Sequence, residues 1–68
     1  MTREQFLRKL RTWSRNNGLT YAWQPGEGKG SHGIVYVGTT KTIVKHGQLT
    51  PTYVRVILKQ LQIPPGAI

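Results

Sequence analysis

The N-terminal segment has its apolar positions at the spacing of a helix. Thr2 and Gln5 form a capping-box pattern, in which each side chain satisfies an orphan backbone donor of the first helical turn. Apolar and basic residues interleave so that one face packs and the other is charged. The apolar set is Phe6, Leu7, Leu10 and Trp13, and the basic set is Arg3, Arg8, Arg11 and Arg15. We predict a helix that ends at residues 16–18, Asn-Asn-Gly.

Three segments with the pattern of strands follow this helix. In residues 19–24 large apolar side chains alternate with small or polar ones, which is the period of a half-buried strand. A second strand is predicted from His32 to Val37 and a third from Lys41 to Lys45, joined by a tight turn. Short connections favour antiparallel pairing, and such a sheet commonly leaves one face to solvent or ligand.

The C-terminal part predicts a second helix. Thr50 before Pro51 is a strong start, because threonine caps helices and proline at the first position lacks only an orphan donor. Pro64 ends the helix, and we expect residues 66–68 to be a frayed tail. The buried stripe is predicted to be Val54, Ile57, Leu58 and Leu61. The predicted fold is therefore α+β, with both helices on one face of a three-stranded antiparallel sheet, and residues 1–68 form a single domain.

Composition narrows the classes of partner. Ten Lys and Arg residues stand against only Glu4 and Glu27, which gives a net charge of +8. Nucleic acid, an anionic membrane surface and an acidic protein are all attracted by such a charge. The chain has no cysteine for a disulfide or thiolate metal site. The apolar residues of positions 1–13 are too spaced for the hydrophobic stretch of a signal peptide, and no segment approaches the apolar length of a membrane span. We expect a cytoplasmic protein that does not enter a membrane.

The chemistry that this composition permits is limited. Imidazole is the side chain that exchanges protons near neutral pH in an ordinary environment, and the chain has His32 and His46. Two carboxylates are too few for two-metal sites, and no carboxylate pair or serine triad is indicated. A histidine-centred reaction without metal or cofactor remains. RNA suits it, because its own 2′-hydroxyl can attack the adjacent phosphate.

The segment before His32 offers groups that bind phosphate. Lys29, Gly30 and Ser31 contribute a cation, open backbone amides and a hydroxyl directly before the histidine. A lone histidine at a strand edge is more often simply solvated, and most glycine-rich loops are merely turns. Residues 26–30, Gly-Glu-Gly-Lys-Gly, also lack the spacing of a phosphate-binding P-loop.

Other basic and aromatic side chains could either bind RNA or have a purely structural role. Lys45 and His46 are candidate RNA contacts, although the end of the third strand favours a structural role for His46 as a cap of the following turn. Charges on helix faces are most often only solubilising, but the excess of one sign favours binding. Some aromatic residues could stack on bases, although their alternation with polar residues favours the core for most of them. These are Tyr21, Trp23 and Tyr36.

A resemblance to a known family adds to these inferences. Residues 28–32, Gly-Lys-Gly-Ser-His, and the following strand resemble the signature of HicA-like toxins, in which a Gly-Ser-His motif opens the second strand. The helix ending at Gly18, the strand to Trp23, the stretch from Thr42 to His46 and the final helix resemble the family in the same order. The segment between Gly18 and Gly30 is a few residues longer than usual, and Gly33 stands where a bulkier residue is more common.

This resemblance implies a fold and a function. It implies a double-stranded-RNA-binding-like arrangement of helix, three antiparallel strands and helix. It also implies a ribosome-independent mRNA interferase toxin of a type II toxin–antitoxin system, with His32 as the active residue. The implied partners are mRNA as substrate and a HicB-type antitoxin that neutralises the toxin in a hetero-oligomer.

Two other functions remain open at this point. A non-catalytic RNA-binding module of the same fold would use the basic face and keep His32 as a phosphate contact. A basic protein-interaction subunit would instead meet an acidic partner through its helix faces. A nuclease shortens RNA, whereas a binding module retards it intact, so the state of the RNA distinguishes them.

Overall fold

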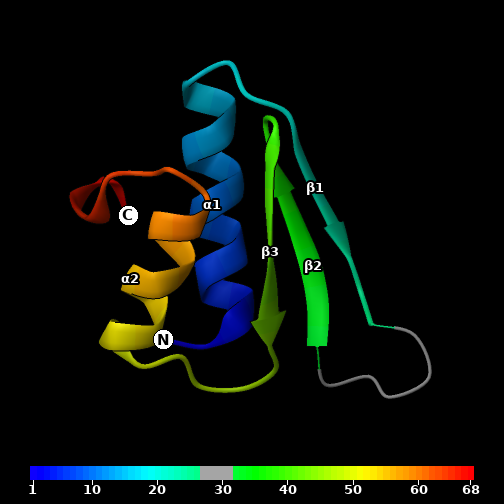
Figure 1. Ribbon diagram of the computed structural model, residues 1–68, viewed down its shortest axis with the longest axis vertical. Helices are drawn as coiled ribbons and strands as arrows, with labels where there is room; N and C mark the ends of the chain where they lie inside the picture. Colours follow the sequence, from blue (N-terminus) through cyan, green and yellow to red (C-terminus); the bar gives the residue numbers. More distant parts are fainter. Residues whose placement is uncertain (27–31) are drawn as a thin grey trace.

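The computed structural model describes residues 1–26 and 32–68 of the chain. Its elements follow the predicted order of helix, three strands and helix, with a short 3₁₀ helix after them (Figure 1). Their bounds are α1 Arg3–Asn16, β1 Tyr21–Gln24, β2 His32–Val37, β3 Thr40–Lys45, α2 Pro51–Gln60 and η1 Pro65–Ala67. The predicted α+β fold is confirmed.

The three strands form one antiparallel sheet in the order β1-β2-β3. Tyr21 lies opposite Val37 at one end of the first pair, and His32 lies opposite Lys45 at one end of the second. Both helices lie on the same side of this sheet (Figure 1). The fold therefore has two layers, and the other face of the sheet is left without a helix.

The core lies between the two helices and the covered face of the sheet. Phe6 and Leu10 of α1 are fully buried there, together with Val35 and Val44 from the two longer strands. Of the predicted stripe on α2, Ile57, Leu58 and Leu61 are buried and Val54 is half-buried against them. Leu7 and Trp13 also pack against the core from α1 while remaining half-buried.

Both predicted helix starts are confirmed by their hydrogen bonds. The Thr2 hydroxyl accepts from the Gln5 backbone N–H at 3.2 Å, and the Gln5 side chain accepts from the Thr2 N–H at 2.9 Å. The Thr50 hydroxyl accepts from the Tyr53 N–H at 3.1 Å. In the described ranges, neither these helices nor the short 3₁₀ turn has the length and apolar character needed to cross a membrane.

Two sequence-based expectations are wrong. Leu19 lies outside β1 and is 40% exposed, because its N–H bonds to the Ser14 carbonyl and the chain is still leaving α1 there. The C-terminal residues are not a frayed tail, since they form η1 and Ile68 packs against the core. Ile63, before these residues, is also buried in the core.

Candidate functional site

The uncovered face of the sheet combines basic, apolar and hydrogen-bonding side chains. Alternation along β2 and β3 places their buried residues toward the helices and the intervening residues on this open face. Ile34 and Ile43 lie opposite each other at its centre, and Ile43 is 57% exposed. The face carries Ala22, Gln24, His32, Ile34, Tyr36, Lys41, Ile43 and Lys45. An exposed apolar centre with polar surroundings is typical of a binding surface.

His32 and Lys45 are neighbours on this open face. They are directly opposite in the β2–β3 register, and both side chains are exposed. Residues opposite each other in an antiparallel pair have Cβ atoms about 4.5–5.5 Å apart. The Lys45 ammonium is 5.0 Å from the centroid of the Tyr53 ring of α2. The sheet register thus makes His32 and Lys45 neighbouring positions, with the ammonium directed toward Tyr53.

A hollow of about 310 Å³ lies beside His32. Gln24 and Pro25 contribute one side of it, and Ile34 and Ile43 contribute the apolar centre of the open face. Gly26 and Gly33 complete its lining together with the histidine. Its volume is at the lower end of the range of small-molecule sites, about 300–1,000 Å³. A compact group at this position would contact the imidazole.

Two glycines allow the close approaches that shape this hollow. A Cβ atom on Gly26 would lie 1.8 Å from the His32 carbonyl oxygen. A Cβ atom on Gly33 would lie 2.3 Å from Cη2 of Trp23, so the indole ring occupies the space of a side chain there. A side chain at position 33 would therefore collide with the ring of Trp23.

Replacing Gly26 by alanine is expected to displace the backbone of His32, because two atoms cannot approach within 1.8 Å. A displacement of about 1 Å at a catalytic group lowers a reaction rate by about 10²-fold. Any reaction that depends on His32 should slow accordingly, measured as the rate of RNA cleavage. Gly66→Ala is the matched control, since no atom lies within 4 Å of its added Cβ. Equal rates for the two variants would contradict this role of Gly26.

Arginines of α1 and aromatic residues of β1 line a second surface. Arg8, Arg11 and Arg15 are three and four residues apart and share one side of the helix. Two adjoining hollows of about 460 and 290 Å³ join this side to β1, and both include Arg11 and Tyr21. We call this surface the arginine groove. It is lined by Arg3, Glu4, Leu7, Arg8, Arg11, Arg15, Leu19, Tyr21 and Trp23.

The arginine groove reaches the end of β2 through Trp23. The guanidinium carbon of Arg3 is 5.0 Å from the centroid of this indole ring, at the distance of a cation–π contact. The same ring lies against Gly33, the residue after His32. Burial raises the pKa of Tyr21 above its ordinary value, and the charge of Arg11 opposes this to a smaller extent. The phenol therefore stays protonated at neutral pH and offers a hydrogen-bond donor.

The remaining predicted site residues lie in different places. His46 is exposed and follows β3 directly, beside Lys45 in the chain. Tyr36 is not part of the core, since it lies on the open face and its hydroxyl donates to Gln24 at 3.3 Å. The predictions for Lys29, Gly30 and Ser31 fall outside the described residues.

The site contains groups for proton transfer and for phosphate binding. His32 can take up or release a proton, while Lys45 and the arginine groove supply positive charge. Within residues 1–26 and 32–68, no three His, Cys, Asp or Glu side chains gather closely enough to hold a metal ion. The chain matches no protein-family model, no curated protein and no solved structure. We therefore infer its function from the residues and the geometry of the site.

Proposed function

We propose that this protein is an endoribonuclease toxin that cleaves mRNA without a metal ion and uses His32 as its catalytic residue. The observation that carries the proposal is the position of His32, exposed on an uncovered sheet face and directly opposite Lys45. A chain of net charge +8 draws RNA to this face. The resemblance of residues 28–32 to the HicA-like signature supports the same assignment.

The proposed reaction uses the substrate's own nucleophile. His32 takes the proton from a ribose 2′-hydroxyl, and the 2′-oxygen forms a bond to the adjacent phosphorus. The bond from phosphorus to the 5′-oxygen of the next nucleotide breaks, and that oxygen takes up a proton. Lys45, opposite His32 in the register, would turn its flexible side chain from Tyr53 toward the phosphate and stabilise the negative charge that grows on its oxygens. The products are a 2′,3′-cyclic phosphate and a free 5′-hydroxyl.

The arginine groove supports the choice of RNA as substrate. It offers four arginines, and Glu4 is the one acid that lines it among the described residues. Its contact with Gly33 through Trp23 leads from the groove to the strand end that carries His32. Because the His32 side chain lies on the other face of the sheet from Trp23, a phosphate backbone along α1 would pass around the edge of β1 to reach the imidazole.

Removing two of these arginines is expected to weaken RNA binding and its salt dependence. Each phosphate contact to single-stranded RNA contributes a slope of about −0.7 in log K against log salt concentration. The double variant Arg11→Gln/Arg15→Gln should therefore reduce the slope by about 1.4, measured by fluorescence anisotropy of a labelled RNA. The matched control Arg55→Gln/Lys59→Gln removes the same charge from exposed positions of α2. If the two double variants have the same slope, the groove does not bind the RNA backbone.

The proposal extends to the setting in which the protein acts. We place it in the cytoplasm, where cleavage of mRNA blocks translation as part of a type II toxin–antitoxin system. A HicB-type antitoxin is the proposed neutralising partner, and acidic groups on it would complement the net charge of +8.

Incubation of purified single-stranded RNA with the wild-type protein in EDTA tests the proposal. Shortened RNA on a denaturing gel is the expected result. RNA that is retarded on a native gel and yet intact would instead support a binding module of this fold, which the arginine groove alone would explain. RNA that is neither shortened nor retarded at low salt would contradict both functions.

A further inference from the structure

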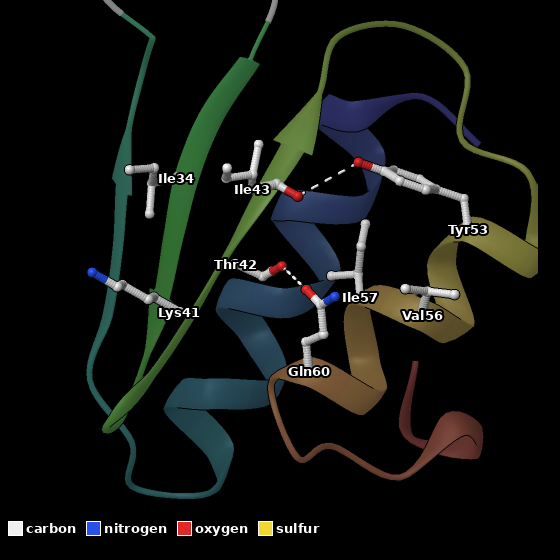
Figure 2. Close-up of a pocket in the computed structure, with 8 residues that line it drawn as sticks. All are labelled: Ile34, Lys41, Thr42, Ile43, Tyr53, Val56, Ile57 and Gln60. Carbon is white, nitrogen blue, oxygen red and sulfur yellow. Dashed lines mark hydrogen bonds between the residues drawn. The ribbon is translucent and has the colours of Figure 1, made fainter.

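Only some of the backbone N–H and C=O groups along the outer edge of β3 have hydrogen-bond partners within the protein. This strand is the last in the sheet, so alternate residues direct their backbone N–H and C=O groups away from β2. The Tyr53 hydroxyl accepts from the Lys45 N–H at 3.2 Å. It donates to the Ile43 carbonyl at 3.5 Å (Figure 2). A single side chain of α2 thereby takes the place that a neighbouring strand would occupy.

The rest of this edge is open. The Lys45 N–H and the Ile43 carbonyl that bond to Tyr53 point away from β2. By the alternation of an antiparallel strand, the Ile43 N–H and both the N–H and the carbonyl of Lys41 point the same way. In the described part of the chain, no hydrogen bond is made to these three groups. Exposed edge groups of this kind are templates for pairing with a further strand.

A groove of about 540 Å³ runs beside the open edge, between β3 and α2 (Figure 2). Its apolar lining includes Ile43, Tyr53 and Val56, of which Ile43 is 57% and Val56 47% exposed. The side chains of Thr42 and Gln60 are hydrogen-bonded to each other across it. The groove therefore offers an apolar surface next to unpaired backbone donors and acceptors.

Charge specifies what kind of segment the groove fits. Lys41 lines the groove. The Lys45 ammonium lies over the ring of Tyr53, which also lines the groove. No acidic residue lines the groove in the described ranges, and the whole chain carries a charge of +8. Extended peptides that add to a sheet edge gain affinity from main-chain hydrogen bonds and specificity from alternate side chains.

We propose that the edge of β3 from Lys41 to Ile43 binds an extended acidic segment of a partner protein as a fourth strand of the sheet. Alternate apolar side chains of that segment would pack between Ile43 and Val56, and its carboxylates would face Lys41 and Lys45. Tyr53 ends the pairing, since its hydroxyl already occupies the next two backbone groups. This binding does not depend on whether His32 cleaves RNA.

Titration of the isotope-labelled full chain with a synthetic peptide tests the proposal by nuclear magnetic resonance. The probe is the acetylated peptide Glu-Asp-Val-Thr-Val-Asp-Glu, and the same peptide N-methylated at its three central amides is the control. The acidic peptide should shift the amides of Lys41 and Ile43 and slow their hydrogen exchange. The methylated peptide cannot donate to the Lys41 carbonyl, and loss of that one hydrogen bond should weaken its binding by about two- to tenfold. Equal binding of the two peptides, or no shift at millimolar peptide, overturns the proposal.

A pair of variants of α2 provides the second arm. Val56→Glu places a negative charge in the groove, whereas Thr52→Glu makes the same change of charge at an exposed position that does not line it. The first should abolish binding of the acidic peptide and the second should preserve it, while both cleave RNA at the wild-type rate. Equal peptide binding by the two variants contradicts the location. An RNA oligonucleotide that shifts the Lys41 and Ile43 amides in place of the peptide would show that this edge serves nucleic acid instead.

Discussion

The His32→Ala variant is expected to cleave RNA about 10²- to 10⁴-fold more slowly than the wild-type protein, which is the usual contribution of a general acid or base. The variant should fold normally, because His32 is exposed at the first position of β2 and adds nothing to the core. The loss of rate at the chemical step is measured by single-turnover cleavage of one labelled RNA, with each protein assayed separately in excess over the RNA. Anisotropy on the same RNA shows whether binding is retained.

The chain offers a matched control for this variant. His46→Ala removes the other imidazole, which is also exposed and lies beyond the end of β3. Its rate should fall less than that of His32→Ala, since the sheet register places His32, and not His46, opposite Lys45. A larger loss in His46→Ala would transfer the catalytic role to that residue.

Phe6→Ala is expected to have the largest effect on stability. Phe6 is fully buried in the core, and removal of a buried phenylalanine side chain costs about 3–5 kcal/mol. Native proteins have a free energy of unfolding of about 0.05–0.15 kcal/mol per residue, or about 3–10 kcal/mol for 68 residues. The variant should therefore lose much or all of its stability, as measured by urea unfolding followed by circular dichroism.

A surface leucine gives the comparison for Phe6→Ala. Leu19 is 40% exposed, and substitutions at surface positions usually change stability by no more than about 0.5 kcal/mol. Leu19→Ala should therefore keep nearly the wild-type midpoint of unfolding. A midpoint shift in Leu19→Ala as large as that in Phe6→Ala would contradict the assignment of the core.

The elements with strong local signals could be predicted from the sequence. Thr2 with Gln5, and Thr50 before Pro51, start helices through bonds between residues close in the chain. The strand predicted from His32 to Val37 has the observed bounds of β2. The C-terminal residues could not be predicted in this way, because Ile68 is ordered by contact with a core that includes residues of α1.

The candidate site was only partly predictable for the same reason. His32 and Lys45 could be selected as candidates from residue type and motif, but their opposition depends on the sheet register. The role of Gly26 depends on its approach to the His32 carbonyl, and that of Tyr53 on the side of β3 along which α2 lies. Neither glycine-rich composition nor a tyrosine in a helix signals such contacts. The packing of Trp23 against Gly33 could not be predicted either, because the ring that fills the space beside this glycine comes from another strand.

We propose different functions for three surfaces of the protein: the open face of the sheet, the arginine groove and the edge of β3. The open face carries His32 and Lys45, which are proposed to act on RNA. The arginine groove between α1 and β1 is proposed to hold the phosphate backbone. The edge of β3 beside α2 is proposed to take a strand of an acidic protein. Because Lys45 ends β3 and lies opposite His32, a partner at that edge would lie next to the reaction site.

The most direct test of the central claim compares RNA and DNA of one sequence, each incubated in EDTA with the wild-type protein and with His32→Ala. We predict that only RNA is cut, that its fragments end in a 2′,3′-cyclic phosphate or the 3′-phosphate formed from it, and that the variant leaves it intact. Cleavage of the DNA, or cleavage of RNA at equal rates by both proteins, would contradict a histidine-dependent attack by the 2′-hydroxyl.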